Sequence, residues 1–217
     1  MQQRWLLVTA HPDDECMFFG PTIVGLRQTG ASVSVLCLST GNAAGLGPLR
    51  QRELFRSCAV LGVPSSQVTC IDDPELQDGS SWQISKAAVH IQKSLEVVDP
   101  THVLTFDAAG ASGHHNHIAT HCAVQTVLSC RKDLQLYLLE TFPLWQKYSP
   151  LPSLAGWASQ LLHGRAAGGS APKITFGALS PVVPWRAMTC HSSQLVWYRY
   201  LWLAFSVYMV YNRLRVV

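Results

Sequence analysis

The sequence is poor in charge: Asp, Glu, Lys and Arg make up 13% of its 217 residues, where a typical soluble domain has about 25%. Hydrophobic residues make up 48%. This composition excludes an intrinsically disordered chain and a solvent-exposed coiled coil, because both need many more charged residues. The length is typical of one domain with a substantial core, and we expect a single domain over residues 1–217.

Acidic residues are absent after Glu140. Residues 1–140 hold all 13 acidic residues and nine Lys or Arg, a net charge of −4, whereas residues 141–217 hold seven Lys or Arg and none that is acidic, a net charge of +7. A segment with this bias suits an anionic surface, either membrane headgroups or nucleic acid. The alternative is a chance bias in a short segment of low charge.

The sequence also lacks the patterns of a secreted or membrane-spanning protein. Its seven cysteines form no CxxC pair and no disulfide framework, which favours a reducing, cytosol-facing compartment. The start of the chain has only a five-residue apolar stretch, too short for a secretory signal. Residues 200–212, 13 uncharged residues, are too short for the roughly 20 apolar residues of a membrane span.

Short apolar runs alternate with helical patterns over the first 140 residues. This alternation predicts an α/β fold: a Rossmann-like, three-layer αβα sandwich with a mostly parallel sheet. The predicted strands are residues 5–9, 31–39, 68–72, 102–107 and 134–140, with another near 174–179. The predicted helices are residues 15–29, 50–61, 83–98 and 116–129. In such sheets, ligands bind beyond the carboxyl ends of the strands.

The alternation of strand and helix patterns weakens in the C-terminal part of the sequence. Residues 163–170 (HGRAAGGS) predict a flexible loop, and residues 185–217 predict one long helix. Seven aromatic residues lie within residues 195–211, namely Trp197, Tyr198, Tyr200, Trp202, Phe205, Tyr208 and Tyr211. Aromatic and basic residues together favour a helix that faces a membrane surface. The alternative is that the aromatic side chains are ordinary core.

The stretch AHPDDE directly follows the first predicted strand. It places His11, Asp13, Asp14 and Glu15 in one strand-to-helix turn. Imidazole nitrogens and carboxylate oxygens are ligands for zinc, and a second, adjacent carboxylate that does not bind the metal can act as a general base. The alternative is that an aspartate caps the following helix; the added His and Glu favour the metal site.

The stretch GHHNH follows the strand predicted for residues 102–107 and supplies a ligand from a second strand end. His114 and His117 lie three positions apart, and His117 and His121 lie four apart, so either pair could face one point. Asp107 is either a residue that orients a ligand or a turn cap. Arg50, at a helix start, could bind a phosphate or simply be a surface cation.

These motifs resemble the LmbE-like, or PIG-L, de-N-acetylase family, and within it the eukaryotic enzymes that act on N-acetylglucosaminylphosphatidylinositol (GlcNAc-PI). The resemblance rests on HPDDECMFFGPTIVGL, the STGN and RQREL stretches, FDAAGASGHHNHIA and CHSSQLVWYRYLWLAFSVYM, over roughly residues 5–140 and 188–212. It implies a zinc-dependent hydrolase that removes acetate from GlcNAc-PI during GPI-anchor biosynthesis. The implied location is the cytoplasmic face of the endoplasmic reticulum membrane.

The resemblance also implies residue roles. His11, Asp14 and His117 match the metal ligands, Asp13 the general base, and His114 the residue that stabilises the oxyanion. Arg50 and His191 match positions that bind or adjoin the substrate. Two other functions stay open: a soluble de-N-acetylase of another GlcNAc conjugate, and a weakened isoform with a binding or regulatory role. A nucleic-acid role has little support, because the basic segment carries no recognised motif.

Overall fold

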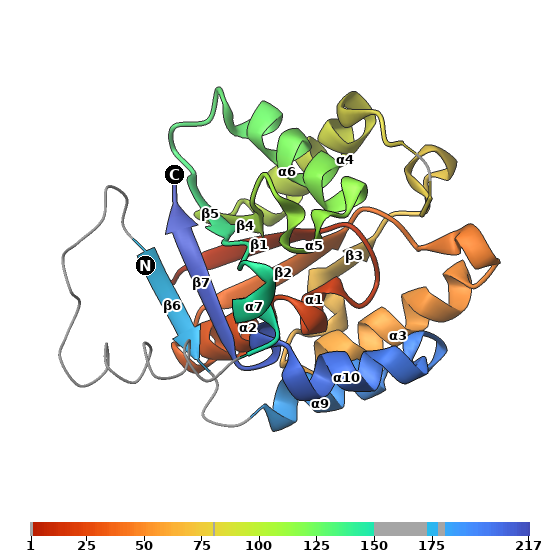
Figure 1. Cartoon of the computed structure of the whole chain (residues 1–217). Coiled ribbons are helices and arrows are strands. Elements are labelled where there is room, and N and C mark those ends of the chain that lie inside the picture. Colours follow the sequence, from red (N-terminus) through yellow and green to blue (C-terminus); the bar gives the residue numbers. More distant parts are fainter. Residues whose placement is uncertain (1, 80, 150–172, 178–180) are drawn as a thin grey trace, which may run out of the picture.

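The computed structural model describes residues 2–79, 81–149, 173–177 and 181–217, and its described strands form one seven-stranded sheet (Figure 1). The strand order is β3-β2-β1-β4-β5-β7-β6. Strands β1 to β5 pair in parallel, and β7 runs antiparallel to both β5 and β6. The strands are β1 (Arg4–Thr9), β2 (Ser32–Cys37), β3 (Val68–Cys70), β4 (His102–Phe106), β5 (Gln135–Leu139), β6 (Lys173–Gly177) and β7 (Tyr211–Val216).

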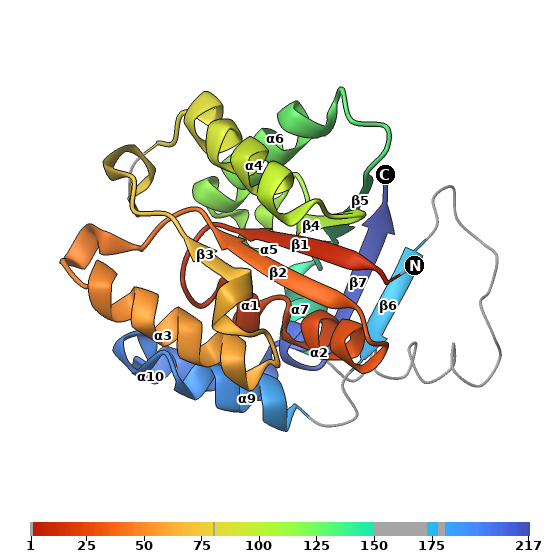
Figure 2. The same cartoon turned by 180° about the vertical axis from the view of Figure 1, so that it is seen from behind.

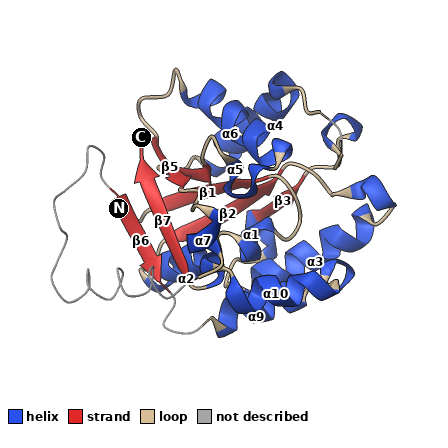
Figure 3. Ribbon diagram, in the orientation of Figure 1, coloured by secondary structure: helices blue, strands red, loops and turns tan. Residues whose placement is uncertain are grey.

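Helices cover both faces of the sheet, as the two opposite views show (Figures 1 and 2). The helices α4 (Ile84–Val98) and α6 (His115–Leu128) pack on one face. The other face carries α1 (Asp14–Met17), α2 (Gly20–Gln28), α3 (Gly47–Val60), α9 (Val182–Thr189) and α10 (Trp197–Phe205). Two short helices, α5 (Gly110–Gly113) and α7 (Leu144–Lys147), follow β4 and β5 (Figure 3). The predicted α/β fold with a mostly parallel sheet is therefore confirmed.

Strand β1 shows why the sheet is buried on both faces. Leu6 and Val8 belong to the core cluster beneath α4 and α6, whereas Trp5 and Leu7 belong to the cluster beneath α2 and α3. Successive strand residues point to opposite faces, so an unbroken apolar run fills both cores. From β1 the chain adds β2 and β3 on one side of the sheet and then crosses to add β4 and β5 on the other side. The carboxyl end of the strand at such a crossover is the usual position of a ligand site in an open α/β sheet.

The helix predicted for residues 15–29 is interrupted. It divides into α1 and α2 at Phe18 and Phe19, whose side chains are buried in the core. The side chain of Asn212 holds this break: its amide nitrogen donates to the carbonyl oxygen of Phe18 at 2.8 Å, and its oxygen accepts from the Thr22 hydroxyl at 2.7 Å.

The prediction of one long helix over residues 185–217 is wrong. The segment forms the end of α9, a 3-10 turn at Ser192–Gln194, helix α10, and strand β7. Strand β7 lies between β5 and β6 and pairs with both. The hydrophobic pattern of this segment is ambiguous between helix and strand, and the pairing with two neighbouring strands decides in favour of a strand. The loop predicted for residues 163–170 lies outside the described residues.

The C-terminal aromatic residues divide into a buried group and an exposed group. Trp202, Tyr208 and Tyr211 are buried in the core. The exposed side chains are those of Trp197, Tyr198, Tyr200 and Phe205. Among the described residues, no helix has the length and apolar character needed to cross a bilayer.

Candidate metal centre and catalytic pocket

A cavity of about 330 Å³ opens at the carboxyl ends of the parallel strands. The loops after β1 and β4 supply the side chains at its centre, as the two motifs predict. The residues that line it are His11, Asp13, Asp14, Met17, Phe18, Arg50, Asp78, Gly79, Ser112, His114, His117, Gln194, Arg199 and Trp202.

Asp14 is held by the turn that carries it. Its Oδ2 accepts hydrogen bonds from the backbone N–H groups of Ala10 (3.0 Å) and His11 (2.8 Å), and its Oδ1 lies 3.1 Å from Nε2 of His117. Burial acts to raise the pKa of Asp14, but the neighbouring His117 and His11 outweigh it and hold this pKa well below its ordinary value. Asp14 is therefore a carboxylate at neutral pH, the form that binds a metal.

His117 is oriented by the loop before α6. Its Nδ1 lies 3.0 Å from the carbonyl oxygen of Gly110, so Nδ1 carries the proton and Nε2 is left facing Asp14. The ring stacks on Phe106 with centroids 4.1 Å apart. Gly110 has φ +62°, and a Cβ there would lie 3.0 Å from Cβ of His117, so a glycine is required at this position.

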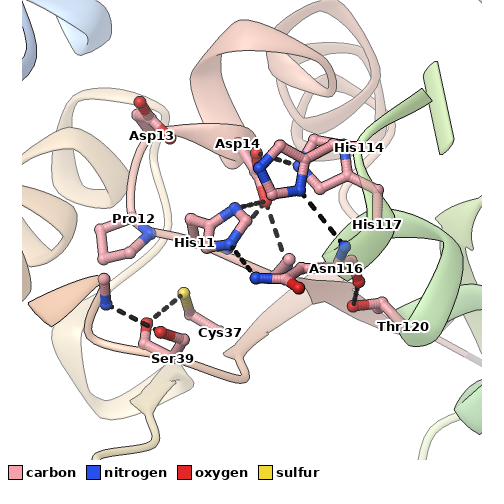
Figure 4. Close-up of polar contacts among 12 residues, drawn as sticks. His11, Pro12, Asp13, Asp14, Cys37, Ser39, His114, Asn116, His117 and Thr120 are labelled. Carbon is pink, nitrogen blue, oxygen red and sulfur yellow. Dashed lines mark hydrogen bonds and ion pairs between the residues drawn. The ribbon is translucent and has the colours of Figure 1, made fainter. Parts of the chain in front are cut away.

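The ligand atoms of His11, His114 and His117 all lie within 4.8 Å of one another. Figure 4 shows these side chains and Asp14 grouped at one point. The imidazoles of His11 and His117 and the carboxylate of Asp14, with His117 fixed by a backbone carbonyl, form a donor set that fits a divalent metal such as zinc. The structure therefore brings together the predicted ligands His11, Asp14 and His117, and it places His114 in the same cluster.

The tautomer of His114 follows from its position as the N-cap of α6. Its Nδ1 accepts a hydrogen bond from the backbone N–H of Asn116 at 3.2 Å, so in the neutral ring the proton is on Nε2. Partial burial and the neighbouring His11 and His117 lower the pKa of His114 to about 4. His114 is thus a neutral N–H donor at physiological pH.

Asp13 lies beside the cluster in an unusual backbone conformation. Its φ is +118°, outside the ordinary range for a residue with a side chain. Its buried carboxyl lies 3.3 Å from Nη2 of Arg199 and 3.8 Å from Nη2 of Arg50. Burial raises the pKa of Asp13 above its ordinary value, and the two arginines oppose this shift without cancelling it. A carboxylate with a raised pKa is suited to accept a proton.

Comparison with known proteins agrees with this geometry. The family model described as "PIG-L: GlcNAc-PI de-N-acetylase" matches residues 6–128. The chain is 39% identical over 216 residues to the N-acetylglucosaminyl-phosphatidylinositol de-N-acetylase of Bos taurus, covering 97% of this chain and 82% of the relative. It is 37% identical over 214 residues to a probable enzyme of the same name from Schizosaccharomyces pombe, covering 97% and 85%. The chain belongs to the PIG-L family.

Solved structures support the fold of this PIG-L protein. A deacetylase mutant of the teicoplanin biosynthetic pathway aligns with a TM-score of 0.68 at 19% identity and covers 99% of this chain and 98% of its own. The N,N'-diacetylchitobiose deacetylase of Pyrococcus horikoshii aligns with a TM-score of 0.62 at 18% identity, covering 99% and 84%. A third structure, with a TM-score of 0.66 at 16% identity and covering 99% and 97%, is described as the zinc-inhibited form of teicoplanin deacetylase Orf2.

Arg50 lines the pocket of this PIG-L protein but is engaged by protein atoms. Its Nη1 donates to the carbonyl oxygen of Gly41 (3.0 Å) and to the carboxylate of Asp78 (2.7 Å), and its Nη2 donates to the carbonyl oxygen of Pro12 (2.9 Å). It joins the loops after β1, β2 and β3. Its contact with substrate stays a prediction.

His191 lies beside the turn that carries Asp13, outside the lining of the pocket. Its side chain is fully buried, and its Nε2 lies 2.7 Å from Oε1 of Glu15. The same Glu15 oxygen accepts from the Ser57 hydroxyl (2.5 Å), and Oε2 accepts from the backbone N–H of Asp13 (3.0 Å). His191 is absent from the pocket lining. Through Glu15 it supports the turn that carries Asp13, and its contact with substrate stays a prediction.

Two further polar side chains that line the pocket, Asp78 and Arg199, were not predicted from the sequence. Asp78 lies in the loop after β3, and its Oδ1 is 2.6 Å from Nε2 of His11. Arg199, on α10, reaches Asp13 from 186 positions further along the chain. The rule that ligands bind beyond strand ends could have identified Asp78. Asp107, in contrast, accepts from the backbone N–H of Thr141 at 2.7 Å and acts as a turn residue.

Proposed function

We propose that this protein hydrolyses the N-acetyl group of GlcNAc-PI, giving glucosaminyl-phosphatidylinositol and acetate, and that zinc or another divalent metal is its cofactor. The observation that carries the proposal is the grouping of Asp13, Asp14, His11, His114 and His117 in one pocket. The full-length similarity to GlcNAc-PI de-N-acetylases supports the choice of substrate.

In this proposal, His11, Asp14 and His117 hold the metal. A metal held there would polarise the acetamide carbonyl and make water more acidic. The protein supplies proton transfer and orientation. Asp13 accepts the proton of the water that attacks the carbonyl carbon, and it returns this proton to the amine nitrogen as the C–N bond breaks. The products are the free amine of the sugar and acetate.

His114 stabilises the negative charge that develops on the carbonyl oxygen. Its Nε2–H is available because the backbone N–H of Asn116 occupies Nδ1. A donor of this kind contributes most when the charge forms, so its effect should appear in kcat. Arg50, which lines the same pocket, is proposed to contact the sugar or inositol hydroxyl groups.

We further infer that the enzyme works against the cytoplasmic face of the endoplasmic reticulum membrane. All seven cysteines are free, which suits a reducing compartment. Helix α10 exposes Trp197, Tyr200 and other aromatic side chains, and Trp145 of α7 is also exposed. Such side chains are favourable in the headgroup layer of a bilayer.

The direct test is acetate release from GlcNAc-PI in phosphatidylcholine vesicles. We expect the purified, metal-loaded protein to release acetate, a chelator to stop the release, and zinc to restore it. Activity that survives exhaustive chelation would contradict the metal proposal. If well-folded, metal-loaded protein releases acetate from a different soluble GlcNAc conjugate but not from GlcNAc-PI, the substrate proposal is wrong.

A further inference from the structure

A second hollow lies beside the catalytic pocket. It has a volume of about 560 Å³, within the range of roughly 300–1,000 Å³ that ligand sites occupy. Its lining consists of Tyr148, Tyr198, Arg199, Leu201, Trp202 and Phe205, and we call it the apolar groove. Arg199 and Trp202 also line the catalytic pocket, so the two hollows share a wall.

The two hollows differ in chemistry. The catalytic pocket is lined mainly by ionisable and polar side chains, whereas the apolar groove has five aromatic or aliphatic side chains and one arginine. Leu201 and Phe205 are 50% and 53% exposed. Apolar side chains grouped in this way at a surface indicate a binding site. A ligand that fills both hollows must therefore have a polar end and an apolar end.

Arg199 and Trp202 form the wall that the two hollows share. Nε of Arg199 and Nε1 of Trp202 are buried and have no hydrogen-bond partner within the part of the chain that the structure describes. Buried donors are nearly always satisfied, so each such atom requires an explanation. The guanidinium of Arg199 faces Asp13 on the side of the catalytic pocket, but its side chain is 25% exposed, and none of the six groove residues is acidic. The partly exposed guanidinium of Arg199 suits an anionic acceptor between the polar and apolar ends of a ligand.

We propose that the apolar groove binds the glycerolipid end of the substrate. Its phosphate then lies at the wall formed by Arg199 and Trp202, and its N-acetylglucosamine enters the catalytic pocket. This inference rests on the proposed function, because it takes a phosphatidylinositol conjugate as the substrate. It adds that the enzyme recognises the lipid directly, in addition to any attraction to the bilayer surface.

The test compares two substrates that share the sugar and inositol phosphate. One is a GlcNAc-PI with two hexanoyl chains, used below its micellar concentration so that no bilayer is present. The other is the water-soluble headgroup without the glycerolipid. We expect kcat/KM of the wild type to be at least tenfold higher for the short-chain lipid. Leu201→Asp should bring this ratio close to one. The control Val97→Asp, at a side chain 85% exposed on α4, should keep the wild-type ratio.

Equal kcat/KM values for the two substrates in the wild type, or a wild-type ratio in Leu201→Asp, would overturn the proposal. Phe205→Asp provides a second groove variant if Leu201→Asp does not fold. Calorimetric binding of dihexanoyl-phosphatidylinositol tests this inference separately from the proposed function, because this ligand has no acetyl group to hydrolyse. If the wild type binds this ligand, Leu201→Asp weakens the binding at least tenfold, and the wild type has no deacetylase activity, then the result supports the groove and contradicts the proposed function. Absence of wild-type binding would contradict the groove even if the enzyme is active.

Discussion

Nε2 of His191 lies 2.7 Å from Oε1 of Glu15, and both side chains are fully buried directly behind Asp13. Burial acts against both charges. The charge of His191 nevertheless lowers the pKa of Glu15, and the charge of Glu15 raises the pKa of His191. Each group therefore favours the charged form of the other. Because Glu15 also accepts the N–H of Asp13, this ion pair holds the unusual backbone conformation of the proposed base.

We expect Glu15→Gln to destabilise the protein by about 3–5 kcal/mol at neutral pH, because it leaves a buried charge without its partner. Urea unfolding measures the change. The control Glu75→Gln breaks the ion pair between Glu75 and Lys86, in which both side chains are half exposed, and should cost less than about 1 kcal/mol. Equal losses in the two variants would contradict the assigned role of Glu15.

The stability difference between the wild type and Glu15→Gln should also depend on pH. The lowered pKa of Glu15 means that its contribution is lost as the pH falls through its folded-state pKa. The raised pKa of His191 means that its contribution is lost as the pH rises through its folded-state pKa. The difference should be largest between these two values. A difference that stays the same as the pH falls through the folded-state pKa of Glu15 and as it rises through that of His191 would show that the pair is not ionised.

For His114→Ala, we expect kcat to fall on the order of 10²–10³-fold, because the oxyanion loses a hydrogen-bond donor. KM should change little. The control is His115→Ala, since His115 is the next residue and is exposed. Steady-state kinetics on GlcNAc-PI in mixed micelles gives both constants. A similar loss in His115→Ala, or a change confined to KM, would be inconsistent with the proposed role.

Metal content should separate His117 from His121. We expect His117→Ala to lose most bound zinc, because Nε2 of His117 faces Asp14 and the other ligands. His121 lies one turn further along α6, and its Nδ1 contacts the carbonyl oxygen of Phe106 at 2.9 Å. His121→Ala should keep its zinc. Inductively coupled plasma mass spectrometry after gel filtration measures both. If His117→Ala retains zinc at one ion per chain, another ligand set holds the metal.

The parts of the site that could be predicted from the sequence are the motifs that directly follow a strand. The AHPDDE and GHHNH stretches each follow an apolar strand, and parallel strands bring their carboxyl ends to one edge. Arg199 and His191 could not be placed in this way. Both reach the site only because α9 and α10 return along α3 before the chain enters the sheet as β7 (Figure 2). That return depends on contacts such as Asn212 with Phe18, which join residues 194 positions apart.

The most direct test of the account is the activity of Asp13→Asn with metal content measured on the same sample. Asparagine keeps the size of the side chain and removes the ability to accept the proton of water. We predict that the variant retains zinc and folding, while glucosaminyl-phosphatidylinositol formation falls on the order of 10²–10⁴-fold. Product formation within tenfold of the wild type, at equal zinc content, would contradict the assignment of Asp13 as the general base.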